Sequence, residues 1–165
     1  MATEPRINPI RPTDDEARRL ARGLIDAARF GALATLDPGT GFPVATRVAL
    51  ATDEDGMPVT LVSRLSNHTA NLFADTRVSL LVGEPGKGDP LTHPRITLFA
   101  QAREVVRGSE AHARIRRRFL AKNPKARLYV DFGDFLFVAF AVQRASLNGG
   151  FGKAYELTRE DVLGL

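Results

Sequence analysis

The stretch of sequence that decides the fold is TLVSRLSNHTANLFADTRVSLLV, residues 60–82. Its apolar start, Thr60 to Ser63, is typical of a β-strand, and a polar turn follows over residues 63–69. Residues 67–74 have the pattern of a short helix, with Leu72 and Phe73 available to pack beneath it. A second apolar segment, Arg77 to Val82, predicts another strand. The unit is therefore a strand, a polar turn, a helix start and a strand.

The polar turn is a candidate anion site. The first N–H groups of a helix have no partner inside the helix and lie at the positive end of its dipole. The hydroxyls of Ser66 and Thr69, the amide of Asn67 and the imidazole of His68 would complete a phosphate seat. The alternative is that Ser66 only caps the helix and the other polar side chains are solvated.

Composition limits the classes of function. The chain has 165 residues, which is enough for one domain with its own core. It has no cysteine, which excludes disulfides, thiolate catalysis and iron–sulfur clusters. The polar start MATEPRINPIRPTDDE lacks a signal-peptide pattern, and no apolar segment is long enough to span a bilayer. We therefore expect a cytoplasmic protein without a membrane partner.

The basic residues are unevenly distributed, although the net charge is only +4. A basic cluster within residues 103–127 comprises Arg103, Arg107, Arg114, Arg116, Arg117, Arg118, Lys122, Lys125 and Arg127. Such clusters occur on nucleic-acid-binding surfaces, but no aromatic residues interleave with these arginines and no recognition motif surrounds them. A solvated helix face is the simpler interpretation, and a nucleic-acid-binding barrel remains the less favoured alternative.

The rest of the chain predicts a barrel of strands with helices around it. Residues 1–12 are expected to form a loose arm, and Thr13 and Glu16 have the spacing of a capping box at the start of an amphipathic helix over 14–28. Strands are predicted over 30–36, 44–52, 59–63, 77–82, 95–106 and 135–147. The remaining predictions are a mobile loop or lid over 83–94, a helix over 109–122, a final extended piece over 153–157 and a short helical turn capped by Thr158.

Tight connections such as Asp53–Gly56 join neighbouring strands, and strands and helices do not alternate as βαβ units would. The predicted fold class is therefore mainly β (α+β): an antiparallel six-stranded split barrel with peripheral helices, in one domain over residues 1–165.

No catalytic motif stands out in the sequence. There is no GxGxxG after a strand, no P-loop and no GxSxG elbow. His68, His93 and His112 lie far apart without metal-ligand spacing, so no metal site is expected. Since no acid, base or nucleophile stands out, an enzyme built on this chain would take its chemistry from a cofactor.

The same residues also resemble a known family. The run LVSRLSNHTANLFADTRVSLLV, with PVATRVAL before it and HPRITLFAQAREV after it, resembles the FMN-binding split-barrel proteins related to pyridoxamine 5′-phosphate oxidase. The segment YVDFGDFLFVAFAVQRASLNGGFGKAYEL is similar to the branch that includes bacterial haem-utilisation proteins. The resemblance covers about Leu20 to Leu157. It implies a homodimer with the flavin at the subunit interface.

The resemblance also implies an FMN site. Arg47 matches the family's phosphate-binding strand arginine, while Ser66, Asn67 and His68 fall on a Ser-Arg-Lys-like trio whose two long cations are replaced here. The flavin ring would lie on the strands around Val48 and Val62. Arg64 or Lys153 would supply a positive group near its pyrimidine edge. The predicted FMN-binding set is Arg47, Val48, Val62, Ser63, Arg64, Ser66, Asn67, His68, Asn71 and Lys153, and no catalytic residue is assigned.

The leading functional prediction is an FMN-dependent oxidoreductase that transfers a hydride or electrons through N5 of the flavin. Oxidation of vitamin B6 is disfavoured, because the second phosphate site of that oxidase has no counterpart after Gly152. Haem-utilisation members carry a haem-ligating histidine near the C-terminus, whereas this chain has no histidine after His112. The alternative prediction is a non-catalytic protein that binds FMN or haem.

Overall fold

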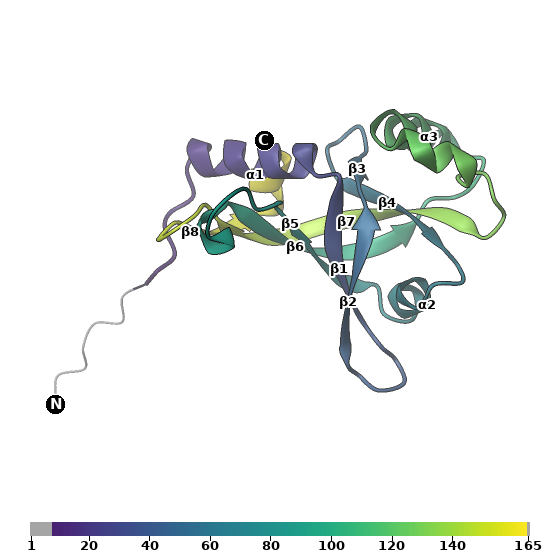
Figure 1. Cartoon of the computed structure of the whole chain (residues 1–165), viewed down its shortest axis with the longest axis horizontal. Coiled ribbons are helices and arrows are strands. Elements are labelled where there is room, and N and C mark those ends of the chain that lie inside the picture. Colours follow the sequence, from purple (N-terminus) through teal and green to yellow (C-terminus); the bar gives the residue numbers. More distant parts are fainter. Residues whose placement is uncertain (1–7, 165) are drawn as a thin grey trace.

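The computed structural model describes residues 8–164 (Figure 1). This part of the chain forms one antiparallel sheet with helices around it. The elements are α1 (Asp15–Ala27), β1 (Phe30–Leu36), β2 (Pro43–Ala49), β3 (Ala51–Thr52), β4 (Pro58–Ser63), α2 (Asn67–Ala74), β5 (Arg77–Val82), η1 (Pro90–Thr92), β6 (Arg95–Glu104), α3 (Glu110–Lys122), η2 (Pro124–Leu128), β7 (Phe135–Asn148), β8 (Ala154–Thr158) and α4 (Arg159–Leu163).

The sheet curls into a split barrel. Its strand order is β2-β1-β5-β6-β7-β4-β3, with β8 paired to β7. β2 and β4 approach each other without pairing, so an open seam remains between them. The hydroxyl of Thr60 in β4 donates to the carbonyl oxygen of Ala49 at the end of β2, with 2.6 Å between the two oxygens. The predicted fold class is confirmed, and the barrel is held together across the seam by side chains and packing.

The sheet has eight strands rather than the predicted six. The predicted strand 44–52 is interrupted at Leu50, whose N–H donates to the carbonyl oxygen of Arg29. β2 therefore pairs with β1, while β3 continues into the hairpin with β4. The expected extended piece at 153–157 is β8, which pairs with the second half of β7.

Helix α1 covers one end of the barrel and buries Ala17, Ala21 and Ile25, as its helical spacing predicted. The predicted cap was wrong by one residue. Asp14 is the N-cap and accepts from the N–H of Ala17 at 2.8 Å, because the hydroxyl of Thr13 donates instead to the carbonyl oxygen of Glu156 in β8. The predicted cap at Thr158 is confirmed, and α4 begins with a capping box formed by Thr158 and Asp161.

The pairing of β6 with β7 contains a β-bulge. Phe99 lies opposite Arg144 and Ala100 lies opposite Val142, so Gln143 is an extra residue in β7. Side chains normally alternate between the two faces of a strand. The bulge breaks that alternation, and the consecutive residues Gln143 and Arg144 are both exposed. It therefore adds a polar pair to the outer face of the sheet.

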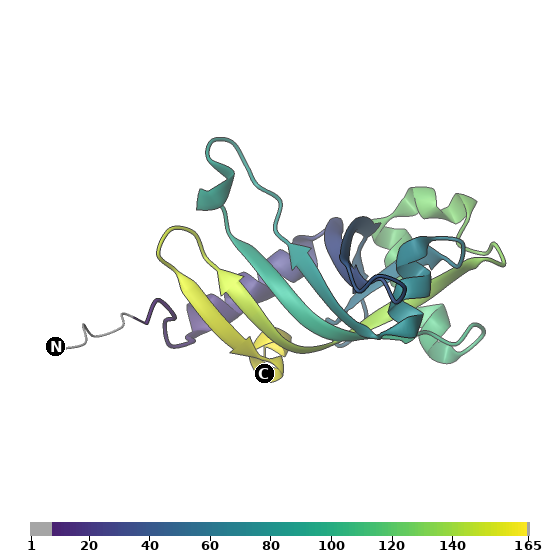
Figure 2. The same cartoon turned by 90° about the horizontal axis from the view of Figure 1, so that it is seen from below.

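Two connections project together from one end of the sheet. Figure 2 shows the loop over residues 83–94 and the β7–β8 hairpin side by side. At Gly150 in the hairpin, a Cβ atom would lie 3.0 Å from the carbonyl oxygen of Thr92 in the loop. Along the same end, Arg11 donates its N–H to Ala154 of β8 at 2.8 Å. Of the expected N-terminal arm, residues 1–7 lie outside the described part of the chain.

None of the helices within residues 8–164 combines the length and the apolar character that crossing a bilayer requires.

Candidate functional site

The predicted phosphate seat is at the start of α2, beside the seam. Ser66 is the N-cap residue, but its side chain makes no capping hydrogen bond. The first turn closes through the N–H of Thr69, which donates to the carbonyl oxygen of Ser66 at 3.1 Å. The side-chain cap that would have explained Ser66 without a ligand is therefore not formed. The hydroxyl of Ser66 and the first N–H groups of α2 remain available to an acceptor.

Two buried hydroxyls near the barrel interior have no partner. The Oγ1 atoms of Thr46 in β2 and Thr69 in α2 make no hydrogen bond within the described part of the chain. Thr69 is only 1% exposed. An unpaired buried hydroxyl costs about 1–3 kcal/mol, so Thr69 favours a bound acceptor or donor at the start of α2. This observation fits a phosphate group in the predicted seat.

The seam supplies unpaired backbone groups. β2 is an edge strand with β1 on one side only, so alternate N–H and C=O groups along it face the seam. The side chains of Val48 and Val62 are 5% and 4% exposed and belong to the barrel core. Contact between a ligand and these two predicted residues would therefore involve their backbone.

Two of the predicted site residues have structural hydrogen bonds. The hydroxyl of Ser63 donates to Oδ2 of Asp134 at 2.7 Å and accepts from the N–H of Leu65. The amide of Asn71 donates to Oγ1 of Thr35 at 3.2 Å in a buried position. These bonds fix the turn before α2 and the helix itself against the barrel.

The predicted cations do not converge within one chain. The guanidinium of Arg47 lies 5.3 Å from the ring centre of Phe30, on the exposed side of β2. Arg64 forms an ion pair with Glu104 and lies over the ring of Phe73. Lys153 lies in the β7–β8 hairpin, whereas β4 pairs with the opposite end of β7.

His68 adds no full charge to the seat at neutral pH. The side chain is half-buried, and burial lowers the pKa of its imidazole below the usual 6.5. A neutral imidazole still donates one hydrogen bond. The positive potential of the turn therefore comes mainly from the end of α2. The roles assigned to all ten predicted residues stay predictions.

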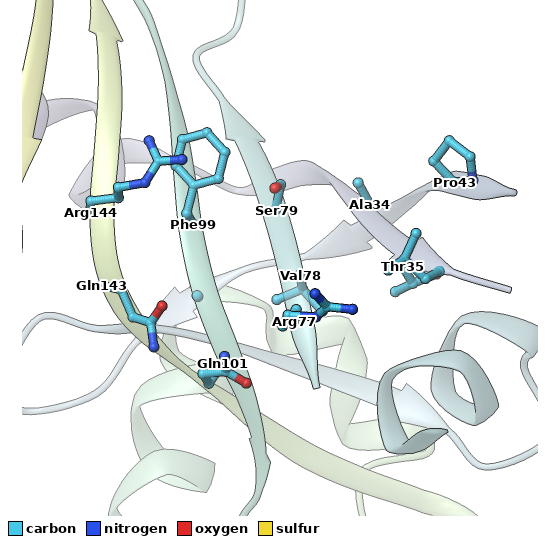
Figure 3. Close-up of a pocket in the computed structure, with 12 residues that line it drawn as sticks. Ala34, Thr35, Pro43, Arg77, Val78, Ser79, Phe99, Gln101, Gln143 and Arg144 are labelled. Atoms are coloured by element: carbon cyan, nitrogen blue, oxygen red, sulfur yellow. The ribbon is translucent and has the colours of Figure 1, made fainter. Parts of the chain in front are cut away.

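A second candidate site lies on the open face of the sheet and was not predicted. Figure 3 shows this sheet-face groove, where side chains from β1, β2, β5, β6 and β7 border a cavity of about 390 Å³. Its lining is Ala34, Thr35, Leu36, Pro43, Arg77, Val78, Ser79, Phe99, Ala100, Gln101, Gln143 and Arg144. Most of these are small or apolar residues, and the polar exceptions include two arginines.

Both arginines of the groove are held in place. The guanidinium of Arg144 lies 3.8 Å from the ring centre of Phe99 and 3.6 Å from a carboxylate oxygen of Glu156. Arg77 donates to both carboxylate oxygens of Asp75, at 3.0 and 2.6 Å. Fixed guanidiniums bind planar carboxylates with little further ordering. The sequence signal for the groove was the pair Gln143-Arg144, two consecutive polar residues that interrupt the alternation of buried and exposed positions in β7.

The family model described as "CREG, beta-barrel" matches residues 12–162. The chain belongs to this family. That assignment agrees with the resemblance read from the sequence, since the relatives of this CREG-family chain include haem proteins of the split-barrel type.

One relative is the non-canonical heme oxygenase HOZ of Arabidopsis thaliana, described as chloroplastic. It is 36% identical over 154 residues, which cover 88% of this chain and 46% of HOZ. A heme binding protein from Mycobacterium smegmatis is 33% identical with a TM-score of 0.81, over 93% of this chain and 61% of that one. The CREG-family chain thus spans less than two thirds of either relative.

The heme storage protein HutZ from Vibrio cholerae shares the fold. Its TM-score is 0.63 at 20% identity, over 81% of this chain and 94% of HutZ. At this level of identity the likeness concerns the architecture alone.

Proposed function

We propose that this CREG-family protein binds haem in the sheet-face groove. The observation that carries the proposal is the combination of small and apolar side chains with the guanidiniums of Arg77 and Arg144. A porphyrin is a planar apolar ring with two carboxylates at its edge, which is the chemistry that such a lining accepts. Support also comes from the two relatives above 30% identity, one named as a heme oxygenase and the other as a heme binding protein.

The residues of the groove fit the porphyrin better than they fit its iron. Ala34, Ser79 and Phe99 offer surface to the ring, while Arg77 and Arg144 would hold the carboxylates. Within residues 8–164 the lining of the groove contains no histidine, so a side chain from outside the groove would have to bind the iron. When bound, haem would supply redox chemistry at the iron, and the chain would orient the ring and its acidic edge.

A haem titration followed by the Soret absorbance tests this proposal. Arg77→Gln and Arg144→Gln should each weaken haem binding by roughly tenfold or more, because a charge-assisted hydrogen bond contributes about 1.5–3 kcal/mol. Arg117→Gln, on the exposed face of α3, is the matched control and should leave the affinity unchanged. If the two groove variants bind haem as the control does, the groove is not the haem site.

A second candidate function, FMN binding, is favoured by the unpartnered hydroxyl of Thr69 beside the open edge of β2. The phosphate would accept from the start of α2 and from Ser66, and the flavin ring would contact the seam-facing backbone of β2. FMN would supply hydride or electron transfer at N5, which would make the protein an FMN-dependent oxidoreductase.

The two cofactors are distinguished by the same set of variants. An FMN titration by fluorescence quenching should respond to Ser66→Ala and Thr69→Val, and not to the groove variants. If FMN stays unbound at every concentration and haem is retained by the protein through gel filtration, FMN is excluded as the cofactor. Retention of FMN together with unchanged haem binding in the groove variants would favour the oxidoreductase.

We also propose that the chain forms a homodimer through the open face of the sheet. The split-barrel resemblance implies such a dimer, and the face carries exposed apolar and small side chains, among them Leu81 at 45% exposure. A partner subunit on this face would close the sheet-face groove and would bring its own β7–β8 hairpin toward it.

A further inference from the structure

The basic cluster in residues 103–127 is used by neither cofactor candidate. Ion pairs and hydrogen bonds within the protein explain three of its arginines. Arg114 and Arg116 pair with the carboxylates of Glu54 and Asp131, at 3.2 and 2.7 Å, and Arg107 donates to the carbonyl oxygens of Phe132 and Phe135. These three arginines therefore tie α3 and the segment before it to their neighbours.

Arg118 and Lys122 differ from Arg114 and Arg116, because they donate only to oxygens that carry no full charge. Nε of Arg118 donates to the carbonyl oxygen of Thr52 at 2.7 Å, and Nη2 reaches the hydroxyl of the same residue at 3.2 Å. Nζ of Lys122 donates to the carbonyl oxygen of Asp26 at 2.7 Å. The two side chains are one helical turn apart and point to the same side of α3.

Both cations line a cavity of about 560 Å³, here called the α3 cavity. Its lining is Asp26, Ala51, Thr52, Arg118, Ala121 and Lys122. α3 forms one wall, β3 the other, and the last turn of α1 closes one end. The space is large enough for a phosphate group with a small organic substituent.

The single acid in this lining is already neutralised. The carboxylate of Asp26 accepts from Arg22 at 2.9 and 3.1 Å, and Arg22 also donates to the carbonyl oxygens of Gly56 and Val162. No carboxylate within residues 8–164 pairs with Arg118 or Lys122. Burial lowers the pKa of Lys122, and the attraction of the nearby Asp26 carboxylate offsets only part of that effect.

We propose that the α3 cavity binds a phosphate monoester or free phosphate. Each cation keeps unused donors, because a guanidinium carries five N–H groups and an ammonium three. A dianion would bridge them and compensate both charges. Asp53, Glu54 and Asp55 lie on the far side of Arg118, in an adjoining recess. This acidic turn would repel a long polyanion, which favours a small phosphate over nucleic acid.

The test measures thermal unfolding of the whole chain against increasing inorganic phosphate, with ionic strength held constant by chloride. The wild-type protein should show a saturable rise in Tm. Lys122→Gln and Arg118→Gln should raise the phosphate concentration at half-saturation roughly tenfold or more. Arg117→Gln is the matched control, because this neighbouring residue is exposed and makes no ion pair within the described residues. It should respond as the wild type does.

The far-UV circular dichroism of each variant, together with its Tm in chloride alone, separates a lost ligand from a damaged fold.

Glycerol 3-phosphate in place of phosphate distinguishes an ester ligand from the free ion, and tighter binding of either agrees with the proposal. A rise in Tm that does not saturate, or that Arg117→Gln loses as fully as Lys122→Gln, would overturn it. So would stabilisation by a single-stranded oligonucleotide with no response to phosphate. Neither haem nor FMN enters this test, so its result is independent of the cofactor.

Discussion

At the scale of single residues, two buried threonines in the same barrel have opposite hydrogen bonding. Thr60 donates to the carbonyl oxygen of Ala49, whereas Oγ1 of Thr69 has no partner in the described part of the chain. Valine has almost the same shape and lacks the hydroxyl. Thr69→Val should therefore stabilise the cofactor-free protein by about 1 kcal/mol, and Thr60→Val should destabilise it by about 1–2 kcal/mol. Urea unfolding measures both. A loss of stability in Thr69→Val would show that this hydroxyl is bonded in solution.

A second residue-scale prediction concerns Asp75 and Arg77. The Arg77 guanidinium lowers the pKa of Asp75 from 3.8 to about 2 in the folded protein. Because the folded pKa is the lower one, the stabilisation is present above about pH 4 and is lost as the pH falls toward 2. Asp75→Asn should therefore be less stable than wild type at pH 5, and the two should converge near pH 2. Urea midpoints at several pH values provide the measurement, and a constant difference would contradict it.

The sequence predicts the role of a residue better when that role depends on its neighbours in the chain than when it depends on a contact with a distant residue. Ser66 could be identified as the first residue of a helix turn because its neighbours carry the signal. The pairing of Arg64 with Glu104, and of Ser63 with Asp134, joins residues far apart in the chain. Such pairs depend on which strands lie side by side, and the local pattern does not contain that information.

At the scale of elements, α4 is a five-residue helix that depends on a single carboxylate. Asp161 accepts from the N–H of Thr158 at 2.9 Å and from Nε of Arg18 at 2.7 Å. It thereby starts the helix and joins it to α1. Asp161→Ala should destabilise the fold by about 2–3 kcal/mol, since it removes a helix cap and a partly buried ion pair. Glu160→Ala, an exposed neighbour in the same turn, should cost less than about 0.5 kcal/mol. Equal losses in chemical denaturation would contradict the assignment.

Sequence periodicity predicted most helices and strands close to their observed positions, because each has an apolar face. It did not predict the break at Leu50. At this residue the chain passes from β2, at one edge of the curled sheet, to β3, at the other edge. It also did not predict the bulge at Gln143. Both features arise where strand pairing, rather than burial of a face, decides the conformation.

At the scale of the whole molecule, the proposed dimer can be tested on the open sheet face. Ala34→Glu places a charge on that face, at the lining of the groove, and a two-fold interface that covers the groove would bury this charge in both subunits. Light scattering after gel filtration should show a dimer for wild type and a monomer for this variant. Ala113→Glu, on the exposed side of α3, is the control and should remain dimeric. A monomeric wild-type protein, or a dimeric Ala34→Glu variant, would refute this interface.

The global architecture could be predicted as a class but not as a complete strand order. Short connections and alternating strands indicate an antiparallel barrel, and the family resemblance narrows this to a split barrel. The neighbours of β7, which are β6 on one side and β4 and β8 on the other, come from three separate parts of the chain. The groove likewise exists only where β1, β2, β5, β6 and β7 lie together, which explains why it was absent from the predicted site.

The bulge in β7 also affects how homologous sequences should be aligned. A relative with one residue fewer between Phe140 and Ala145 would have ordinary alternation there, so a single outward-facing side chain would take the place of the pair Gln143 and Arg144. Conversely, a relative that keeps the residue count can present its cation to the groove even if the neighbouring residues differ. The number of residues in this strand therefore indicates which homologues retain two adjacent side chains on the groove face.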